Sequence, residues 1–224
     1  MSNALGQANS RSVFAVIPVK TLLRSKTRLS EILNPQERQT LTLTMLEDVL
    51  EAVQRSYMIQ KVVVVSSDYK VREFASNFGA KFLPEKTQGL NQAVEQAIGW
   101  CVENDAKSVL VLPADIPLIT SSNVDHIINL GSEQTSIVIS PSKNGGTNAL
   151  LQKPPNLIPL HFGPQSFSRH LAEASNKGVI PRIYRSQNVA IDIDSPQDLE
   201  NLLKIETQTS THKFLKRIRK PYHS

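Results

Sequence analysis

The chain has 224 residues, 40% of them hydrophobic, and carries a net charge of +5 at pH 7. This length allows one substantial hydrophobic core, and no apolar run approaches the roughly 18 residues of a membrane-spanning helix. The N-terminal stretch lacks the apolar core of a secretion signal, and the single cysteine, Cys101, excludes an intrachain disulfide. We therefore expect a protein of the reducing cytoplasm with no membrane partner.

The positive charge is concentrated at one end of the chain. Residues 205–224 hold five lysines or arginines against one glutamate, so the rest of the chain is close to neutral. We expect this basic tail to be a solvated end, with contact to nucleic acid or another anionic surface as the alternative. Residues 1–12 are expected to be a disordered leader or the remnant of a tag, which leaves 13–204 as one domain.

Strand-like and helix-like segments alternate along the chain. Short apolar, β-branched runs predict strands, and apolar residues that recur at helical spacing predict helices. We expect extended segments at 13–19, 61–68, 80–85, 108–115, 135–142, 180–186 and 188–194. We expect helices at 34–55, 69–79, 91–104, 120–131, 164–178 and 195–204. This order is typical of an α/β protein whose sheet is covered on both faces, with ligands bound beyond the carboxyl ends of its strands.

Three aspartates follow apolar segments at such positions. Asp115 ends a central strand between Pro113 and Pro117, and Asp192 and Asp194 project to the same side of an extended segment. Carboxylates that share a face repel each other, and Mg²⁺ relieves that repulsion and takes their oxygens as ligands. The three residues therefore predict a metal site of the kind used in phosphoryl or nucleotidyl transfer. The alternatives are a turn residue at 115, a solvated residue at 192 and a helix cap at 194.

Four cations follow the first strand within nine residues. The loop "PVKTLLRSKTRLS" contains Lys20, Arg24, Lys26 and Arg28, which together can neutralise a polyphosphate. A solubilising surface loop is the alternative. The loop matches neither the P-loop pattern nor GxGxxG, which argues against a dinucleotide-dependent dehydrogenase.

Other loops offer backbone amides and small polar groups. Before the helix at 91–104 stand Glu85, Gly89 and Asn91, where Asn91 either caps the helix or contacts a base or ribose. Two glycine-containing loops are suited to anions, although ordinary turns explain them as well. Their residues of interest are Gly145, Gly146, Thr147, Asn148, Gly163 and Ser166. The five histidines lack metal-ligand spacing, and we expect His161 and His170 beside the second loop to be structural.

Six motifs in order resemble one known family. "FAVIPVK…SKTRLS", "EKTQGLNQAV", "VLPADIPL", "GGTNAL", "FGPQSFSRH" and "DIDSPQDL" look like the 2-phospho-L-lactate guanylyltransferases of coenzyme F(420) biosynthesis, over residues 13–203. The resemblance implies one nucleotidyltransferase domain of the glycosyltransferase-A-like, nucleotide-diphospho-sugar transferase-like type. Such a domain is a three-layer αβα structure with a mostly parallel mixed sheet, and the family suggests a homodimer.

The resemblance also implies roles for the residues above. The metal ions would be held by Asp115, Asp192 and Asp194. The GTP phosphates would meet Lys20, Lys26 and Arg28, with Lys20, Lys26 and Asp115 as the catalytic set. The nucleoside would lie near Glu85, Gly89 and Asn91. The acceptor would be held by Thr147, Asn148, Gly163 and Ser166.

The implied reaction moves GMP from GTP to the phosphate of 2-phospholactate, phosphoenolpyruvate or 3-phosphoglycerate and releases pyrophosphate. An acceptor phosphate is largely ionised near neutral pH, so this reaction needs no general base, and none is visible in the sequence. Two alternatives stay open. One is a nucleotidyltransferase for a sugar phosphate or molybdopterin, and the other is a nucleotide-binding module without turnover.

Overall fold

The computed structural model describes residues 12–218, so most of the expected leader and residues 219–224 of the basic tail lie outside it. The strands are β1 (Val13–Pro18), β2 (Ile59–Ser66), β3 (Lys81–Pro84), β4 (Ser108–Val111), β5 (Ser136–Pro141), β6 (Thr147–Lys153) and β7 (Arg182–Ile183). The α-helices are α1 (Pro35–Gln54), α2 (Tyr69–Asn77), α3 (Leu90–Glu103), α4 (Ser121–Leu130), α5 (Ser166–Asn176), α6 (Gln187–Ala190), α7 (Pro196–Leu203) and α8 (Ser210–Ile218). Two 3₁₀ turns, η2 (Leu22–Arg24) and η3 (Thr27–Leu29), follow β1.

The strands form one seven-stranded sheet in the order β3-β2-β1-β4-β6-β5-β7. β6 runs antiparallel to β4 and β5, and the other neighbours are parallel. The predicted α/β class with a mostly parallel mixed sheet is therefore confirmed. The carboxyl ends of β1, β2 and β4 meet at one edge, so the loops that follow them are brought together.

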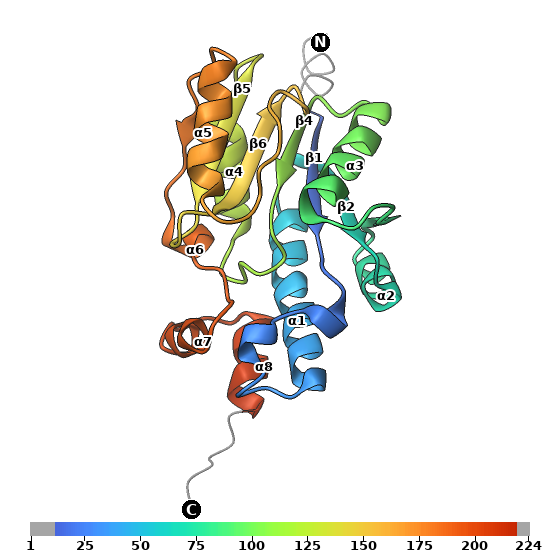
Figure 1. Ribbon diagram of the computed structural model, residues 1–224, viewed down its shortest axis with the longest axis vertical. Helices are drawn as coiled ribbons and strands as arrows, with labels where there is room; N and C mark the ends of the chain where they lie inside the picture. The colour runs from blue at the N-terminus through green and yellow to red at the C-terminus, as the bar shows by residue number, and fades with distance from the viewer. Residues whose placement is uncertain (1–11, 219–224) are drawn as a thin grey trace, which may run out of the picture.

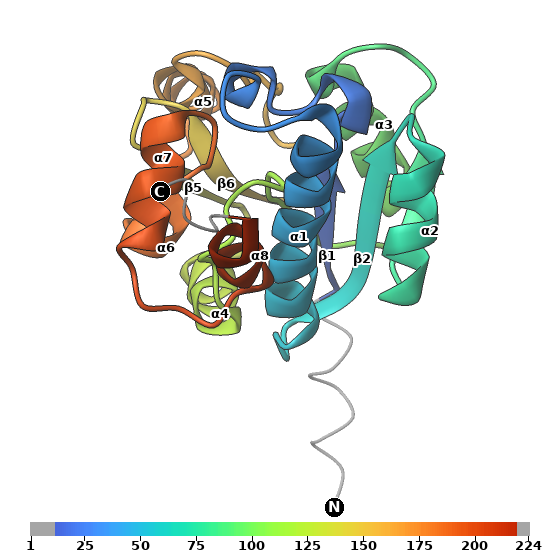
Figure 2. The same ribbon diagram turned by 90° about the horizontal axis from the view of Figure 1, so that it is seen from below.

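Alternating side chains of the strands feed two separate apolar layers. In β1, Ala15 and Ile17 pack on the side of α1, α2 and α4, while Phe14 and Val16 pack on the side of α3. Figures 1 and 2 show α1 and α3 on opposite sides of β1, and α5 covers the α3 side further along the sheet. This is the expected three-layer arrangement.

The structure corrects three expectations about local structure. The glycine loop at 142–151 leads directly into β6, which was not expected because Asn148, Ala149 and Leu150 have little β propensity. Pairing on both sides outweighs that weak preference. The expected strand at 180–186 is reduced to β7, and the extended segment expected at 188–194 begins with the short helix α6.

Part of the basic tail is folded rather than solvated. Ser210–Ile218 forms α8, which buries Phe214 and Leu215 in a third apolar cluster beside α1. The Asp48 carboxylate of α1 accepts hydrogen bonds from the backbone N–H groups of Ser210 (2.7 Å) and Thr211 (3.0 Å) and thereby caps α8. The expectation failed because the cations of this segment occupy one helix face and leave an apolar face opposite. Within residues 12–218, no helix is long and apolar enough to cross a membrane.

Candidate active site

The loop after β1 directs the side chain of Lys26 toward the interior of the protein. Leu22 and Leu29 anchor the loop with only 2% and 0% of their surface exposed, and the Leu22 N–H donates to Asp68 Oδ2 (2.9 Å). Between the two anchors, Lys26 takes a left-handed backbone conformation with φ of +50°. Its side chain is only 7% exposed as a result, while Lys20 and Arg28 remain exposed.

Lys26 joins two carboxylates from distant segments. Its Nζ lies 2.6 Å from Asp115 Oδ2 and 2.7 Å from Asp194 Oδ1. The backbone of the two acidic segments is also linked, since the Ile193 N–H donates to the Asp115 carbonyl (3.0 Å). We call Lys26, Asp115 and Asp194 the Lys26 cluster, and it brings together three residues predicted for the site.

The third apolar cluster of the fold explains why these segments meet. It contains Leu29, three residues after Lys26; Leu118, three residues after Asp115; and Ile193, which directly precedes Asp194. Each charged side chain therefore stands beside an apolar residue that is buried in the same place. The burial of these apolar residues supplies the free energy that holds the charges close together.

The charges of the cluster stabilise one another. Burial alone would lower the pKa of Lys26, but Asp115 and Asp194 outweigh it and raise that pKa, so the amine stays protonated. Burial likewise opposes ionisation of Asp194, but Lys26, with help from Arg28 and Lys20, lowers the pKa of this carboxyl. Asp194 is therefore ionised at neutral pH.

Asp192 lies beside this cluster without joining the ion pair. Burial, followed by the negative charge of Asp115, raises the pKa of Asp192. The Asn148 amide Nδ2 donates to Asp192 Oδ1 (3.3 Å) and to the Val189 carbonyl (2.9 Å). Asn148, which was predicted to bind the acceptor, thus holds the segment that carries Asp192.

The three carboxylates fit a divalent cation in chemistry but not in their present spacing. Carboxylate oxygens are the ligands that Mg²⁺ prefers, and here Asp115 and Asp194 face one buried ammonium group while Asp192 lies near enough to feel the charges of both. However, Lys26 Nζ fills the point between Asp115 and Asp194. Across residues 12–218, no three His, Cys, Asp or Glu side chains are arranged to hold a metal ion. A metal ion at this point would require the lysine amine to move away.

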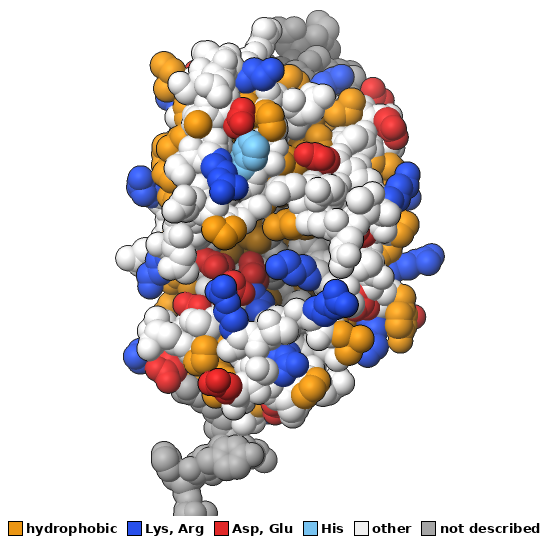
Figure 3. Space-filling model, viewed as in Figure 1, with side chains coloured by type: hydrophobic (Ala, Val, Ile, Leu, Met, Phe, Trp, Pro, Cys, Tyr) orange, Lys and Arg blue, Asp and Glu red, His pale blue; other side chains and the backbone are white. Residues whose placement is uncertain are grey.

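Two adjoining cavities open at the same edge of the sheet. One of about 310 Å³ is lined by the Lys26 cluster together with Lys20 and Arg28. The other, of about 230 Å³, is lined by Glu85, Gln88 and Gly89. Both include Pro18, Val19, Lys20, Arg24 and Leu90 in their walls. Figure 3 shows acidic and basic side chains around a hollow near the middle of this face.

The three residues predicted near the nucleoside divide into two groups. Glu85 and Gly89 line the smaller cavity, and the Gly89 N–H donates to Glu85 Oε1 (3.0 Å). Gly89 has φ of +137°, a conformation that side chains rarely adopt. Asn91 instead binds the backbone of Phe162: its side chain accepts from the Phe162 N–H (2.8 Å) and donates to the Phe162 carbonyl (3.2 Å). It joins the start of α3 to the loop before α5.

Two of the four residues predicted for the acceptor, Thr147 and Ser166, form a neutral cluster with His170. Ser166 Oγ donates to Thr147 Oγ1 (3.1 Å), which also lies 3.0 Å from His170 Nδ1. The backbone N–H of His161 donates to His170 Nε2 (3.0 Å). We call Thr147, Ser166 and His170 the His170 cluster. Gly163 begins the turn that positions it, since its carbonyl accepts from the Ser166 N–H (3.2 Å).

These hydrogen bonds assign the proton of His170. The side chain is fully buried, and burial together with the neighbouring His161 lowers its pKa to about 4, so it is neutral. Because Nε2 accepts from a backbone N–H, the ring proton lies on Nδ1 and is donated to Thr147 Oγ1. Both lone pairs of Thr147 Oγ1 are then used, which leaves its own O–H free to donate.

The residues that support this cluster have only weak signals in the sequence. His170 was expected to be structural, and its contacts agree, but its link to Thr147 was not foreseen. Ser142 was missed as well, although its Oγ accepts from the Gly146 N–H (2.8 Å) and closes the glycine turn. The signal for Ser142 is a small polar residue four positions before a glycine, and the signal for His170 is a histidine seven positions after one; both are too common to single out a site.

Comparison with known proteins gives matches along almost the whole chain. A family model described as "Guanylyl transferase CofC like" matches residues 13–222. The phosphoenolpyruvate guanylyltransferase of Rubrobacter xylanophilus is 44% identical over 192 residues, covering 85% of this chain and 93% of that protein. The 2-phospho-L-lactate guanylyltransferase of Methanocaldococcus vulcanius is 40% identical over 205 residues, covering 91% and 90%.

Solved structures agree on the fold. The 4-diphosphocytidyl-2C-methyl-D-erythritol synthase of Anaerococcus prevotii matches with a TM-score of 0.64 and 13% identity, covering 96% of this chain and 100% of that one. A cytidylyltransferase of Leptospira borgpetersenii matches with a TM-score of 0.61 and 16% identity, covering 93% and 94%. At such low identity these likenesses establish the architecture alone.

Proposed function

The chain belongs to the CofC-like guanylyl transferase family, and from this premise we propose that it guanylylates 2-phospho-L-lactate or phosphoenolpyruvate in coenzyme F(420) biosynthesis. GTP is the donor, and GMP passes to the phosphate of the acceptor while pyrophosphate leaves. The observation that carries the proposal is the Lys26 cluster in the wall of a cavity that adjoins a second one.

The two cavities suit the two parts of GTP. The smaller cavity, with Glu85 and Gly89, would take the nucleoside. The larger one, with Lys20, Lys26 and Arg28, would take the triphosphate, because three cations offset most of its charge. Lys20 lines both cavities and would meet the phosphates where the two halves join.

The acidic residues would serve a metal ion. We infer that Asp115, Asp192 and Asp194 hold Mg²⁺ when GTP is bound. Bound Mg²⁺ would neutralise the charge that develops on the phosphates during transfer. Lys26 would then give up its place between two carboxylates and turn its amine to the phosphates in the same cavity. Asn148 would keep Asp192 in position throughout.

The remaining work is orientation rather than proton transfer. A phosphate oxygen of the acceptor attacks the α-phosphorus of GTP, a new P–O bond forms there, and the bond to the bridging oxygen of pyrophosphate breaks. The attacking oxygen carries no proton, so no side chain has to remove one. Lys20, Lys26 and Arg28 hold the donor in line, which is the main contribution a protein makes to such transfers.

The acceptor would bind beside the His170 cluster. The free O–H of Thr147 can donate to an anionic oxygen, and Ser166 opens α5, whose N-terminus favours negative charge. Gly163 and Ser166 would supply further contacts from the same turn. A small acid with a phosphate and a carboxylate matches these donors.

The direct test is release of pyrophosphate from GTP in the presence of Mg²⁺. We expect release with 2-phospholactate or phosphoenolpyruvate and much less with glucose 1-phosphate, and we expect GTP to be preferred over ATP and CTP. Including 3-phosphoglycerate completes the panel of three-carbon acids. No release with any of these three acids would contradict the proposal. Release with the sugar phosphate alone would instead indicate a different acceptor.

A further inference from the structure

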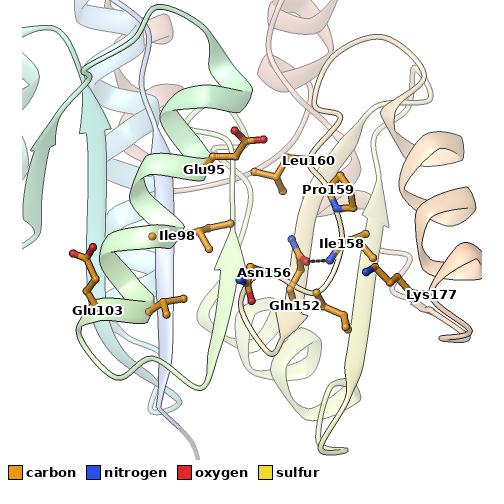
Figure 4. Close-up of a pocket in the computed structure, with 12 residues that line it drawn as sticks. Glu95, Ile98, Glu103, Gln152, Asn156, Ile158, Pro159, Leu160 and Lys177 are labelled. Atoms are coloured by element: carbon orange, nitrogen blue, oxygen red, sulfur yellow. Dashed lines mark hydrogen bonds between the residues drawn. The ribbon is translucent and has the colours of Figure 1, made fainter.

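A separate groove lies on the other side of α3 from the cavities described above. It has a volume of about 630 Å³ and runs between α3 and the segment 156–160 that follows β6 (Figure 4). Its walls are mainly apolar, with Ile98, Val102, Ile158 and Leu160 among them. It shares no lining residue with the two cavities of the candidate active site. Its volume is in the range of small-molecule sites.

The groove contains a buried hydrogen-bond donor without a partner. Gln152 lies near the end of β6 and is only 1% exposed, and its Oε1 accepts from the Ile158 N–H (2.7 Å). That bond fixes the amide so that Nε2 points away from Ile158, toward α3 and Leu160 (Figure 4). Nε2 has no hydrogen-bond partner among residues 12–218. An unpaired buried donor is unfavourable in the folded protein, so a ligand that accepts from it removes that penalty.

A glycine in α3 keeps the groove open. Gly99 lies in the interior of the helix and lines the groove, and a Cβ built there would meet nothing within 4 Å. Close packing therefore does not require glycine at this position. A glycine inside a helix is less favourable than an alanine, because it loses more backbone entropy on folding. Its effect here is to leave space beside Ile98 that a side chain would occupy.

The charges around the groove restrict the kind of ligand that it can bind. Glu95 and Glu103 lie on the α3 wall and Lys177 on the opposite one. Two carboxylates against one ammonium disfavour an anionic ligand, although a carboxylate would be a good acceptor for Gln152. The apolar walls disfavour a small, strongly hydrated ligand. What fits is an uncharged, mostly apolar molecule with one carbonyl oxygen.

We propose that this groove is a second ligand site, which binds a neutral, largely apolar small molecule whose carbonyl oxygen accepts a hydrogen bond from Gln152 Nε2. That nitrogen is itself closed to solvent, so the carbonyl reaches it only when neighbouring apolar side chains shift. Leu160 directly precedes His161, whose N–H holds His170. An occupied groove therefore touches the segment that supports the His170 cluster.

The test uses acetanilide, a neutral phenyl amide, as the probe. Protein labelled with ¹⁵N in its glutamines is titrated without nucleotide while the side-chain amide of Gln152 is followed by NMR. We expect a saturable shift of this amide. Phenylacetate, which has similar size but a negative charge, should bind several-fold more weakly. Ethylbenzene, which has no acceptor, should not shift the amide in the same direction.

A matched pair of variants at Gly99 locates the binding. Gly99→Leu fills the groove and should weaken acetanilide at least tenfold, whereas Gly99→Ala should bind it within about twofold of the parent. Both variants should unfold at or above the parent's temperature, because the added side chains enter open space. The proposal is wrong if acetanilide gives no saturable shift. That result is expected if the Gln152 amide is already bonded to a buried water. It is also wrong if Gly99→Leu binds as well as the parent. No step of this test depends on guanylyl transfer.

Discussion

The Lys26 cluster, which is partly buried, and the His170 cluster, which is buried, are both polar and both placed at the carboxyl edge of the sheet, yet they are stabilised in opposite ways. In the Lys26 cluster one ammonium is shared by two carboxylates at 2.6 and 2.7 Å. In the His170 cluster a neutral imidazole, two hydroxyls and a backbone N–H are joined by directed hydrogen bonds. A charged cluster can exchange its ammonium for another cation. A neutral cluster holds no cation that could be exchanged.

This difference indicates that the two clusters have different roles in the reaction. The Lys26 cluster lies in a cavity wall, where GTP and a metal ion would bring charges that compete for the same carboxylates. The His170 cluster fixes two loops and leaves the hydroxyl proton of Thr147 free to donate. We therefore infer that the first rearranges during the reaction and the second stays in place. Four substitutions test the contrast, beginning with the largest effect.

Removing the charge of Asp115 should affect turnover most. Asp115→Asn leaves Lys26 paired to Asp194 but removes one carboxylate from the inferred metal site, so we expect pyrophosphate release to fall by about 10²–10³-fold. The matched control is Asp105→Asn, an exposed position with φ of +67° that asparagine tolerates well. Equal activity of the two variants would mean that Asp115 is structural.

Removing the ammonium should affect stability as well as turnover. Lys26→Met leaves Asp115 and Asp194 facing each other, and breaking a buried pair in this way costs about 3 kcal/mol. Since Asp194 is 44% exposed, solvent will screen part of this loss. The pKa of Asp194 is lowered in the fold, so its contribution to stability is present above its ordinary pKa and disappears as pH falls below it. Urea unfolding should therefore separate the variant from the parent at pH 7, and the difference should shrink as the pH falls below the ordinary pKa of an aspartate.

The same variant addresses the exchange of cations. Without its ammonium, the Lys26 cluster should bind Mg²⁺ more readily, so Mg²⁺ alone should raise the unfolding temperature of Lys26→Met more than that of the parent. If Mg²⁺ stabilises both proteins equally, Lys26 does not occupy a place that the metal ion uses.

The neutral cluster should also lose stability on acidification, but at a higher pH than the Lys26 cluster. The pKa of His170 is lowered to about 4 in the fold, against about 6.5 when unfolded, so stability is lost as pH falls from 6.5 toward 4. The expected loss between pH 7 and pH 5 is about 2 kcal/mol. Asp48, whose pKa is raised to about 6 by burial, changes stability in the opposite direction, because its protonation favours the folded state as the pH falls. The comparison is therefore between the parent and His170→Asn, and only the parent should lose this increment.

The sequence was sufficient to place the carboxylates but not the lysine. Asp115 and Asp194 both follow apolar segments that end at one edge of a parallel sheet, so their approach could be predicted from the order of the elements. The position of Lys26 Nζ depends on a left-handed turn and on partners 89 and 168 residues away. Such a turn has no reliable signature in a residue other than glycine.

Two asparagines show the same limit. The family resemblance implies ligand contacts for Asn91 and Asn148, and both follow glycines within two positions. In the structure their amides bind the backbone of Phe162 and Val189, in segments 71 and 41 residues away. An amide is equally suited to a nucleotide and to a backbone, so residue type and position cannot separate the two uses. Only the fold determines which partner is near.

The smallest effect concerns the acceptor, and it rests on the proposed function. Asparagine at 170 can place its amide N–H where Nδ1 stands and so still donate to Thr147, while glutamine can place its oxygen where Nε2 stands and so still accept from the His161 N–H. If His170 acts by directing the Thr147 proton outward, His170→Gln should raise KM for the acceptor about tenfold, the cost of about one hydrogen bond to a charged group. His170→Asn should raise it less, and KM for GTP should be unchanged in both. The exposed His126→Asn serves as the control. Equal rises in both KM values, in both variants, would show that His170 merely supports the fold, because a loosened edge of the sheet affects both substrates alike.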